Sequence, residues 1–312
     1  MRRYGWLLLW VGSAVWSGSV LAQSADPADV PHGAAAGESQ HEIAWIEGPD
    51  EVDVGVDLAT LALPEGFAFA GPADARFILS QMGNQTHGGE MGLVVPTDES
   101  QQWFIVFEWN GVGYVKDEEK DTLDPDAIFK SLKAADEEGN VWRRENGFPT
   151  MTLTHWFEAP HYDPETNHLV WATHYDVEDG SKTVNYNVRM LARRGLMSVT
   201  LVEEPHLLEP AMPGARRIFE GLTFKTGSRY AEWKPGDKVA TYGLTALVAA
   251  GAGAAAVKLG FFGVLMKFLG KAWKVVAVAV LGLAGAIGKF FRGLTGRRAE
   301  IPTGHDEEPP SA

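Results

Sequence analysis

Residues 155–176, "HWFEAPHYDPETNHLVWATHYD", contain two runs with strand character on either side of a turn signal. The turn reads Asp-Pro-Glu-Thr-Asn, in which proline presets one backbone position and asparagine tolerates the left-handed one. Two more such runs follow directly, and each is separated from its neighbour by a short turn signal. Strands joined by short turns pair in antiparallel fashion. The four strands predicted here are 150–158, 168–177, 182–193 and 195–203.

Three helical segments interrupt the predicted strands. Asp124 is a candidate N-cap and Pro125 fits the first helical position, ahead of an apolar stripe at helical spacing. A shorter helix is predicted over 73–83, and a third beginning near Pro213. The resulting order, ββ-α-ββ-α-ββββ-α, predicts an α+β fold in which helices flank an antiparallel sheet in layers.

The N-terminus has the features of an export signal. Two arginines precede an apolar stretch, and Val20 and Ala22 occupy the small-residue positions of a cleavage site. We therefore expect a signal peptide over 1–22 and a flexible leader over 23–41. The chain has no cysteine, which excludes disulfides, thiolate ligands and cysteine nucleophiles.

The charge is distributed unevenly along the chain. Residues 23–233 contain 15 Lys and Arg against 36 Asp and Glu, whereas residues 234–298 contain 10 Lys and Arg and one acid. We expect a folded acidic domain over 42–233, which would repel phosphate backbones, so nucleic acid is not expected as a partner. The basic part coincides with apolar sequence, which favours a membrane as a partner.

The apolar C-terminal sequence predicts a membrane anchor over 234–298. Residues 239–257 carry no charge and are long enough for a transmembrane helix, and a second apolar segment covers 272–291. The second segment either completes a hairpin or lies in the interface, so one or two spans remain open. Residues 299–312 are expected to form a disordered tail. We expect the acidic domain on the periplasmic side of a bacterial inner (cytoplasmic) membrane.

Several motifs along the chain resemble those of one protein family. In order they are "VDVGVDLATLALPEGFAF", "QMGN", "GYVKDEEKDTLDPDAI", "VNYNVRMLARRGLMSVTLV" and "RYAEWKPGDKVATYGLTALV". Together, over roughly 45–292, they resemble the bacterial membrane-anchored proteins grouped as domain of unknown function family 2167. The resemblance implies an exported domain with a C-terminal anchor and assigns no activity or catalytic residue. The element order also resembles the layered folds of the PsbP/Mog1 type, an analogy that supplies no function.

The histidines of the first predicted hairpin are candidate metal ligands. A register in which paired residue numbers sum to 329 or 331 places His155 and His174 on one face, whereas a sum of 330 separates them. Asp176 lies nearby as a third candidate. Zinc or copper would accept such ligands, and no other cofactor is expected. The alternative is a cross-strand polar pair on a half-buried sheet.

A second candidate site is a pair of amides. Asn185 and Asn187 alternate with Tyr186, so both point to one face of their strand. They can bind a polar ligand or bond to a neighbouring loop. The acidic run 116–126 lacks the glycine and the final glutamate of an EF-hand loop and is expected to be a solvated loop whose last acids cap a helix.

The sequence contains no recognisable catalytic motif, which favours a binding or interaction module over an enzyme. We expect a non-enzymatic envelope protein that binds another envelope or membrane protein or senses a small ligand. The alternative is a membrane-tethered, metal-dependent hydrolase that uses His155 and His174.

Overall fold

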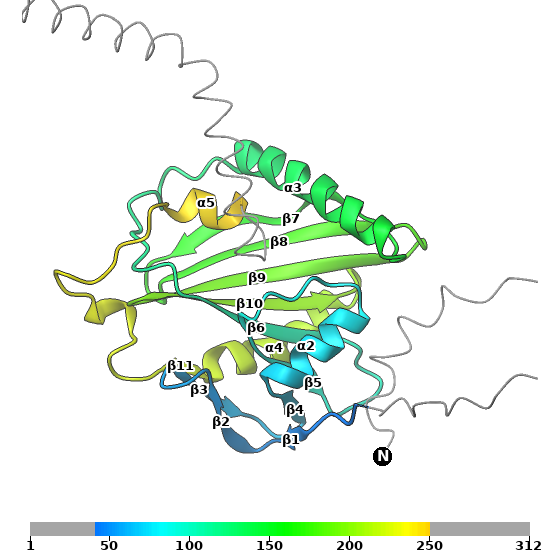
Figure 1. Ribbon diagram of the computed structural model, residues 1–312, viewed down its shortest axis with the longest axis horizontal. Coiled ribbons are helices and arrows are strands. Elements are labelled where there is room, and N and C mark those ends of the chain that lie inside the picture. Colours follow the sequence, from blue (N-terminus) through cyan, green and yellow to red (C-terminus); the bar gives the residue numbers. More distant parts are fainter. Residues whose placement is uncertain (1–40, 250–312) are drawn as a thin grey trace, which may run out of the picture. The chain divides into compact units, whose positions relative to one another are not determined.

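A computed structural model describes residues 41–249 of the chain (Figure 1). Several predicted segments lie wholly or partly outside these residues. They are the signal peptide, the leader up to residue 40, residues 250–257 of the first span, the second apolar segment and the tail.

An eight-stranded antiparallel sheet forms the centre of the described domain. The four strands predicted between residues 150 and 203 form one half of this sheet in consecutive order. The predicted α+β class with a large antiparallel sheet is confirmed. In spatial order the strands are β1 (Trp45–Glu47), β4 (Phe67–Ala70), β5 (Glu90–Pro96), β6 (Phe104–Asn110), β10 (Gly195–Glu203), β9 (Lys182–Ala192), β8 (His168–Val177) and β7 (Met151–Asp163).

A smaller sheet and the helices cover the two faces of the large sheet (Figure 1). The small sheet consists of β2 (Asp50–Val54), β3 (Ala59–Leu63) and β11 (Leu222–Phe224), with β3 in the middle. We call the face covered by α2, α3 and α5 the α3 face, and the face covered by α4 and the small sheet the α4 face. The helices are α2 (Pro72–Gln81), α3 (Pro125–Glu145), α4 (Leu208–Gly221) and α5 (Leu244–Ala249).

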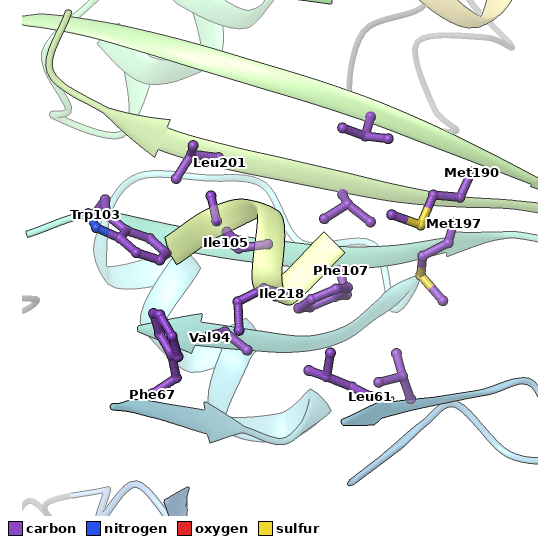
Figure 2. Close-up of a cluster of buried hydrophobic side chains, with 14 of the residues drawn as sticks. Leu61, Phe67, Val94, Trp103, Ile105, Phe107, Met190, Met197, Leu201 and Ile218 are labelled. Atoms are coloured by element: carbon purple, nitrogen blue, oxygen red, sulfur yellow. The ribbon is translucent and has the colours of Figure 1, made fainter. Parts of the chain in front are cut away.

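The largest apolar core lies on the α4 face. Figure 2 shows Ile105, Phe107 and Leu201 of the large sheet beneath Ile218 of α4, and all four side chains are buried. Leu61 of the small sheet joins the same core. The α3 face has two separate apolar clusters, one under α2 and one under α3 and α5. The sheet therefore has one continuous core on one side and a divided core on the other.

Helix α3 begins as its sequence predicts. The side chain of Asp124 accepts hydrogen bonds from the backbone N–H groups of Asp126 and Ala127, both at 3.1 Å, and Pro125 is the first helical residue. Ile128 and Leu132 are buried against the sheet. The expected capping role for the end of the acidic run is confirmed.

Helix α4 departs from the sequence prediction. It begins at Leu208 rather than near Pro213, which lies inside the helix. An internal proline removes one backbone hydrogen bond and usually interrupts a helix. Burial of one helix face outweighs that cost here, because apolar side chains pack against the sheet on both sides of the proline. These side chains are Leu208, Ala211, Ala215 and Ile218.

The turn between β9 and β10 contains only two residues. Ala192 pairs with Gly195, so Arg193 and Arg194 form the turn and Gly195 belongs to the strand. A Cβ atom on Gly195 would lie 2.0 Å from the carbonyl oxygen of Asn110 on β6. Glycine is required there because the neighbouring strand approaches closely.

A segment that we call the C-terminal strap (residues 227–249) packs on the large-sheet domain. Arg193 donates two hydrogen bonds to Asp237, of 2.7 and 2.9 Å, and thereby ties the strap to the β9–β10 turn. Tyr230 stacks on Tyr114 with ring centroids 4.6 Å apart. The strap also forms a parallel bridge between Val239 and Tyr114.

The end of the strap lies within the predicted span 239–257. Its short helix α5 buries Leu244, Leu247 and Val248 in the cluster under α3, and Glu119 accepts a hydrogen bond of 2.8 Å from the backbone N–H of Thr245. Between residues 41 and 249, no helix is long and apolar enough to cross a membrane.

Replacement of the α3 N-cap should weaken the fold measurably. Asp124→Ala leaves two backbone N–H groups without their acceptor, which costs about 1 kcal/mol and lowers Tm by roughly 2–4 °C. The measurement is thermal unfolding of the full-length chain by circular dichroism. Asp121→Ala, in the exposed loop before the helix, is the matched control. Equal Tm values for the two variants would contradict the assigned cap.

Candidate functional site

Four polar residues form a line across the α3 face of the large sheet. Glu90 pairs with Glu108, Glu108 with Ser198, and Ser198 with Arg189, on strands β5, β6, β10 and β9. Residues directly opposite each other in a sheet point to the same face. All four are buried. We call this set, Glu90, Glu108, Ser198 and Arg189, the charged row.

A β-bulge places Glu90 in the charged row. Glu90 pairs with Glu108 while Gly92 pairs with Phe107, so Met91 is the extra residue of the bulge. Gly92 is needed next to it, because an added Cβ would lie 2.3 Å from the ring of Phe69. Bulges redirect individual side chains and are frequent beside functional sites.

The charged row separates the two apolar clusters of the α3 face. Along β10, Val202 packs in the cluster under α2 and Leu196 in the cluster under α3 and α5. Thr200 and Ser198 lie between them, and both are buried. The divided core therefore surrounds a strip of buried polar groups.

His87 joins the two carboxylates at the end of the row. Its Nε2 lies 3.1 Å from Oε1 of Glu108 and 3.7 Å from Oε1 of Glu90. The two oxygens of Glu90 accept hydrogen bonds of 2.8 Å from the backbone N–H groups of His87 and Gly88. The histidine side chain is 24% exposed, against 0% for Glu90 and 11% for Glu108, so solvent reaches the cluster from the histidine side.

These three residues form a potential metal-binding group. Their ligand atoms all lie within 4.8 Å of one another, and across residues 41–249 no other three His, Cys, Asp or Glu side chains meet this condition. An imidazole and two carboxylates are ligands that divalent transition metals accept.

Arg189 adds a positive charge to the same row, two strands away from Glu108. Its guanidinium carbon lies 4.7 Å from the ring centroid of Trp171, in a cation–π arrangement. Burial lowers the pKa of Arg189 to about 10, and the charge of Glu108 opposes that shift. The arginine therefore stays charged at neutral pH, and the charge of Glu108 favours that charged form.

The structure brings His155 and His174 together on the other face. They are paired between β7 and β8, and their rings stack with centroids 4.5 Å apart. The hydroxyl of Thr154 lies 3.0 Å from Nδ1 of His155 and 2.8 Å from Nδ1 of His174. Asp176 lies 3.9 Å from Nδ1 of His174. Metal binding by these three residues stays a prediction.

The β7–β8 hairpin does not keep one register along its length. His155 pairs with His174, a sum of 329, whereas His161 pairs with Val170, a sum of 331. Bulges in β7 account for the change. His168 consequently pairs with Asp163 rather than His161.

Asn185 and Asn187 lie on the α3 face, next to Arg189 on the same strand. The side-chain amide of Asn187 donates a hydrogen bond of 2.8 Å to the backbone oxygen of Asn185 and accepts one of 3.2 Å from Thr200. Tyr186 faces the other side and stacks on Phe219 of α4. The predicted alternation is present, and ligand binding by the two amides stays a prediction.

Sequence reasoning missed His87, Glu90, Glu108 and Arg189. One signal was available: Glu108 is a charge inside a strand that otherwise reads as apolar on both faces. Arg189 is a similar exception in β9. A charge in a buried strand needs a partner, so two such charges of opposite sign predict a contact.

The chain matches the model of the family described as "Protein of unknown function (DUF2167)" over residues 46–282. It belongs to this family, and the predicted resemblance is confirmed. No curated protein matches the chain. Among solved structures it is similar to the solution structure of cyanobacterial PsbP (CyanoP) from Synechocystis sp. PCC 6803. That similarity has 10% sequence identity and a TM-score of 0.34, and covers 62% of this chain and 99% of the other.

Removal of one charge from the row should destabilise the domain strongly. Glu108→Gln removes the carboxylate charge that opposes the desolvation of the buried Arg189, at a cost of about 1–3 kcal/mol. Arg189→Met in the same chain removes the buried guanidinium as well, so the double variant should lose less stability than the two single losses combined. Thermal unfolding of the full-length chain measures both, with the exposed Glu165→Gln as control. Strictly additive losses would contradict a Glu108–Arg189 interaction.

The buried histidine should make stability depend on pH. Burial lowers the pKa of His174 below 6.5, and the neighbouring His155 and Lys182 add to the effect against the opposing charge of Asp176. The unfolded chain then binds a proton more readily, so stability is lost as pH falls from about 7 through the folded pKa.

We expect Tm to fall between pH 7.5 and pH 5 by a larger amount in the wild type than in His174→Gln. His161→Gln, an exposed histidine on β7, serves as the matched variant and should keep the wild-type pH dependence. A His174→Gln chain with unchanged pH dependence would show that His174 does not contribute.

Proposed function

We propose that this protein is a non-enzymatic binding module of the bacterial cell envelope, held on the periplasmic side of the cytoplasmic membrane. Three features of the sequence support this proposal: the signal-like N-terminus, the acidic composition of residues 23–233, and the basic, apolar composition of residues 234–298. The family match also extends 33 residues past Ala249, so the family unit includes both the domain and part of the apolar sequence.

The docked C-terminal strap is the observation that carries the proposal. The chain does not leave the domain through a flexible linker after Phe224, but packs along it as far as α5. An anchor that follows such a strap holds the domain close to the bilayer. Leu244, Leu247 and Val248 are buried in the domain, so this proposal assigns the bilayer contact mainly to residues beyond Ala249.

The charge of the domain favours a particular kind of partner. Anionic lipids repel the acidic domain and attract the lysines and arginines of residues 250–298. The domain surface therefore remains available to another protein. We infer that the partner is an envelope or membrane protein with a basic surface, because complementary charge speeds association and selects partners.

The first test is a crosslinked pull-down of the full-length protein from its native membranes, followed by mass spectrometry. We expect a reproducible partner, and direct binding of that partner once it is purified. A matched chain with residues 250–298 replaced by a generic anchor, which keeps the strap and α5, should recover the same protein. Absence of a reproducible partner, or its loss with the generic anchor, would contradict a binding role for the domain.

Orientation can be checked with single cysteines, since the chain has none of its own. Glu165→Cys in the exposed β7–β8 turn should react with a membrane-impermeant maleimide from outside the cytoplasmic membrane. Protection of this cysteine until the membrane is lysed would contradict a periplasmic domain. His305→Cys reports on the anchor, since labelling from outside would establish a hairpin and protection would establish a single span.

A further inference from the structure

We propose that His87, Glu90 and Glu108 form a binding site for one divalent transition-metal ion, with zinc as the probe ion. The site lies at the end of the charged row on the α3 face, where the loop between α2 and β5 meets the large sheet. It goes beyond the proposed binding role and does not depend on a protein partner.

The distances between the three side chains suit a common ion. Zinc bound by histidine nitrogen and carboxylate oxygen lies about 2.1 Å from each ligand atom. Two ligands at that distance, separated by the observed 3.1 or 3.7 Å, subtend angles of about 95° or 124° at the ion. The first angle lies close to the octahedral value of about 90°, and the second exceeds the tetrahedral value of about 109° by about 15°. The separations between His87 and each carboxylate are therefore compatible with one ion, and the ligand atoms of the two carboxylates lie within 4.8 Å of each other.

The ligands are held in place by the surrounding backbone. Glu108 and Glu90 are fixed opposite each other by pairing of β6 and β5. The backbone N–H groups of His87 and Gly88 orient the carboxylate of Glu90. Trp109, next to Glu108, donates a backbone hydrogen bond of 2.8 Å to Gly89, which ties the loop to the strand. Such support is characteristic of preorganised metal sites.

The charges of the row favour a cation at this point. Glu90 and Glu108 are buried opposite each other beside His87, whereas Arg189 lies two strands away from Glu108. Buried charges in proteins are paired or coordinate metals. In the metal-free cluster, Nε2 of His87 lies within hydrogen-bond distance of Glu108. On binding, the ion replaces the hydrogen at Nε2, which moves to Nδ1, and the 3.3 Å contact of Nδ1 with Gly89 N–H is lost.

The ligand set favours zinc over calcium or magnesium. Calcium takes six to eight oxygen ligands and magnesium keeps an oxygen octahedron, whereas zinc accepts three protein ligands with nitrogen among them. The partial exposure of His87 leaves room for water as a fourth ligand. The stacked pair His155 and His174 is the competing site, because it offers two imidazoles and Asp176.

The test is zinc titration of the full-length, detergent-solubilised protein, stripped with a chelator and carrying an affinity tag without histidine. Isothermal titration calorimetry should show one equivalent bound by the wild type. His87→Gln removes a partly exposed ligand and leaves the buried carboxylates in place. It should raise the Kd for zinc at least about 100-fold, because loss of a residue that only supports a metal ligand already lowers metal affinity about 10–100-fold. Zinc should also raise Tm of the wild type and leave Tm of His87→Gln unchanged.

His155→Gln and His174→Gln are the matched controls, and both should keep Kd within about twofold of the wild-type value. Glu90→Gln with an unchanged circular dichroism spectrum should weaken zinc binding as His87→Gln does. The proposal is overturned if the wild type binds less than one equivalent, which would leave His87 as the partner of two carboxylates only. It is also overturned if His87→Gln binds as tightly as the wild type, or if binding is lost in the His155 and His174 variants instead.

Discussion

The burial of two directly opposed carboxylates in the central strands is the constraint on which the α3 face depends. Like charges opposite each other in a sheet destabilise it unless something balances them. Here Arg189 supplies a charge from two strands away, and His87 reaches in from a loop. The bulge at Met91 and the small Ser198 make room for this arrangement. The row interrupts an otherwise apolar surface, so α2 packs over one cluster and α3 with α5 over the other.

The two faces of the sheet consequently differ in character. The α4 face is a continuous apolar core closed by α4 and the small sheet, and it holds the largest of the three apolar clusters. The α3 face combines apolar clusters, a polar row and the docked strap. Both the proposed metal site and the segment that leads to the proposed anchor lie on this second face. The proposed metal site and the strap thus share the face whose apolar core is divided.

Sequence signals predicted the elements that local chemistry determines. The N-cap of α3 and the consecutive strands β7 to β10 depend on residues near one another in the chain, and both are confirmed. The predicted start of α4 near Pro213 is wrong, because packing on the sheet outweighs the helix-breaking tendency of this proline. The candidate cluster could not be predicted from the sequence. Glu90, Glu108 and Arg189 are aligned in one row only by the register of strands that are far apart in sequence.

X-ray absorption at the zinc K-edge tests the central claim, that the charged row ends in a metal site, most directly. The account predicts a first shell of nitrogen and oxygen at about 2.0–2.2 Å with the scattering of a single imidazole ring, from the full-length protein loaded with one equivalent of zinc. Scattering from two imidazoles would place the ion at His155 and His174. A shell of water oxygens alone would show that the charged row is balanced without a metal.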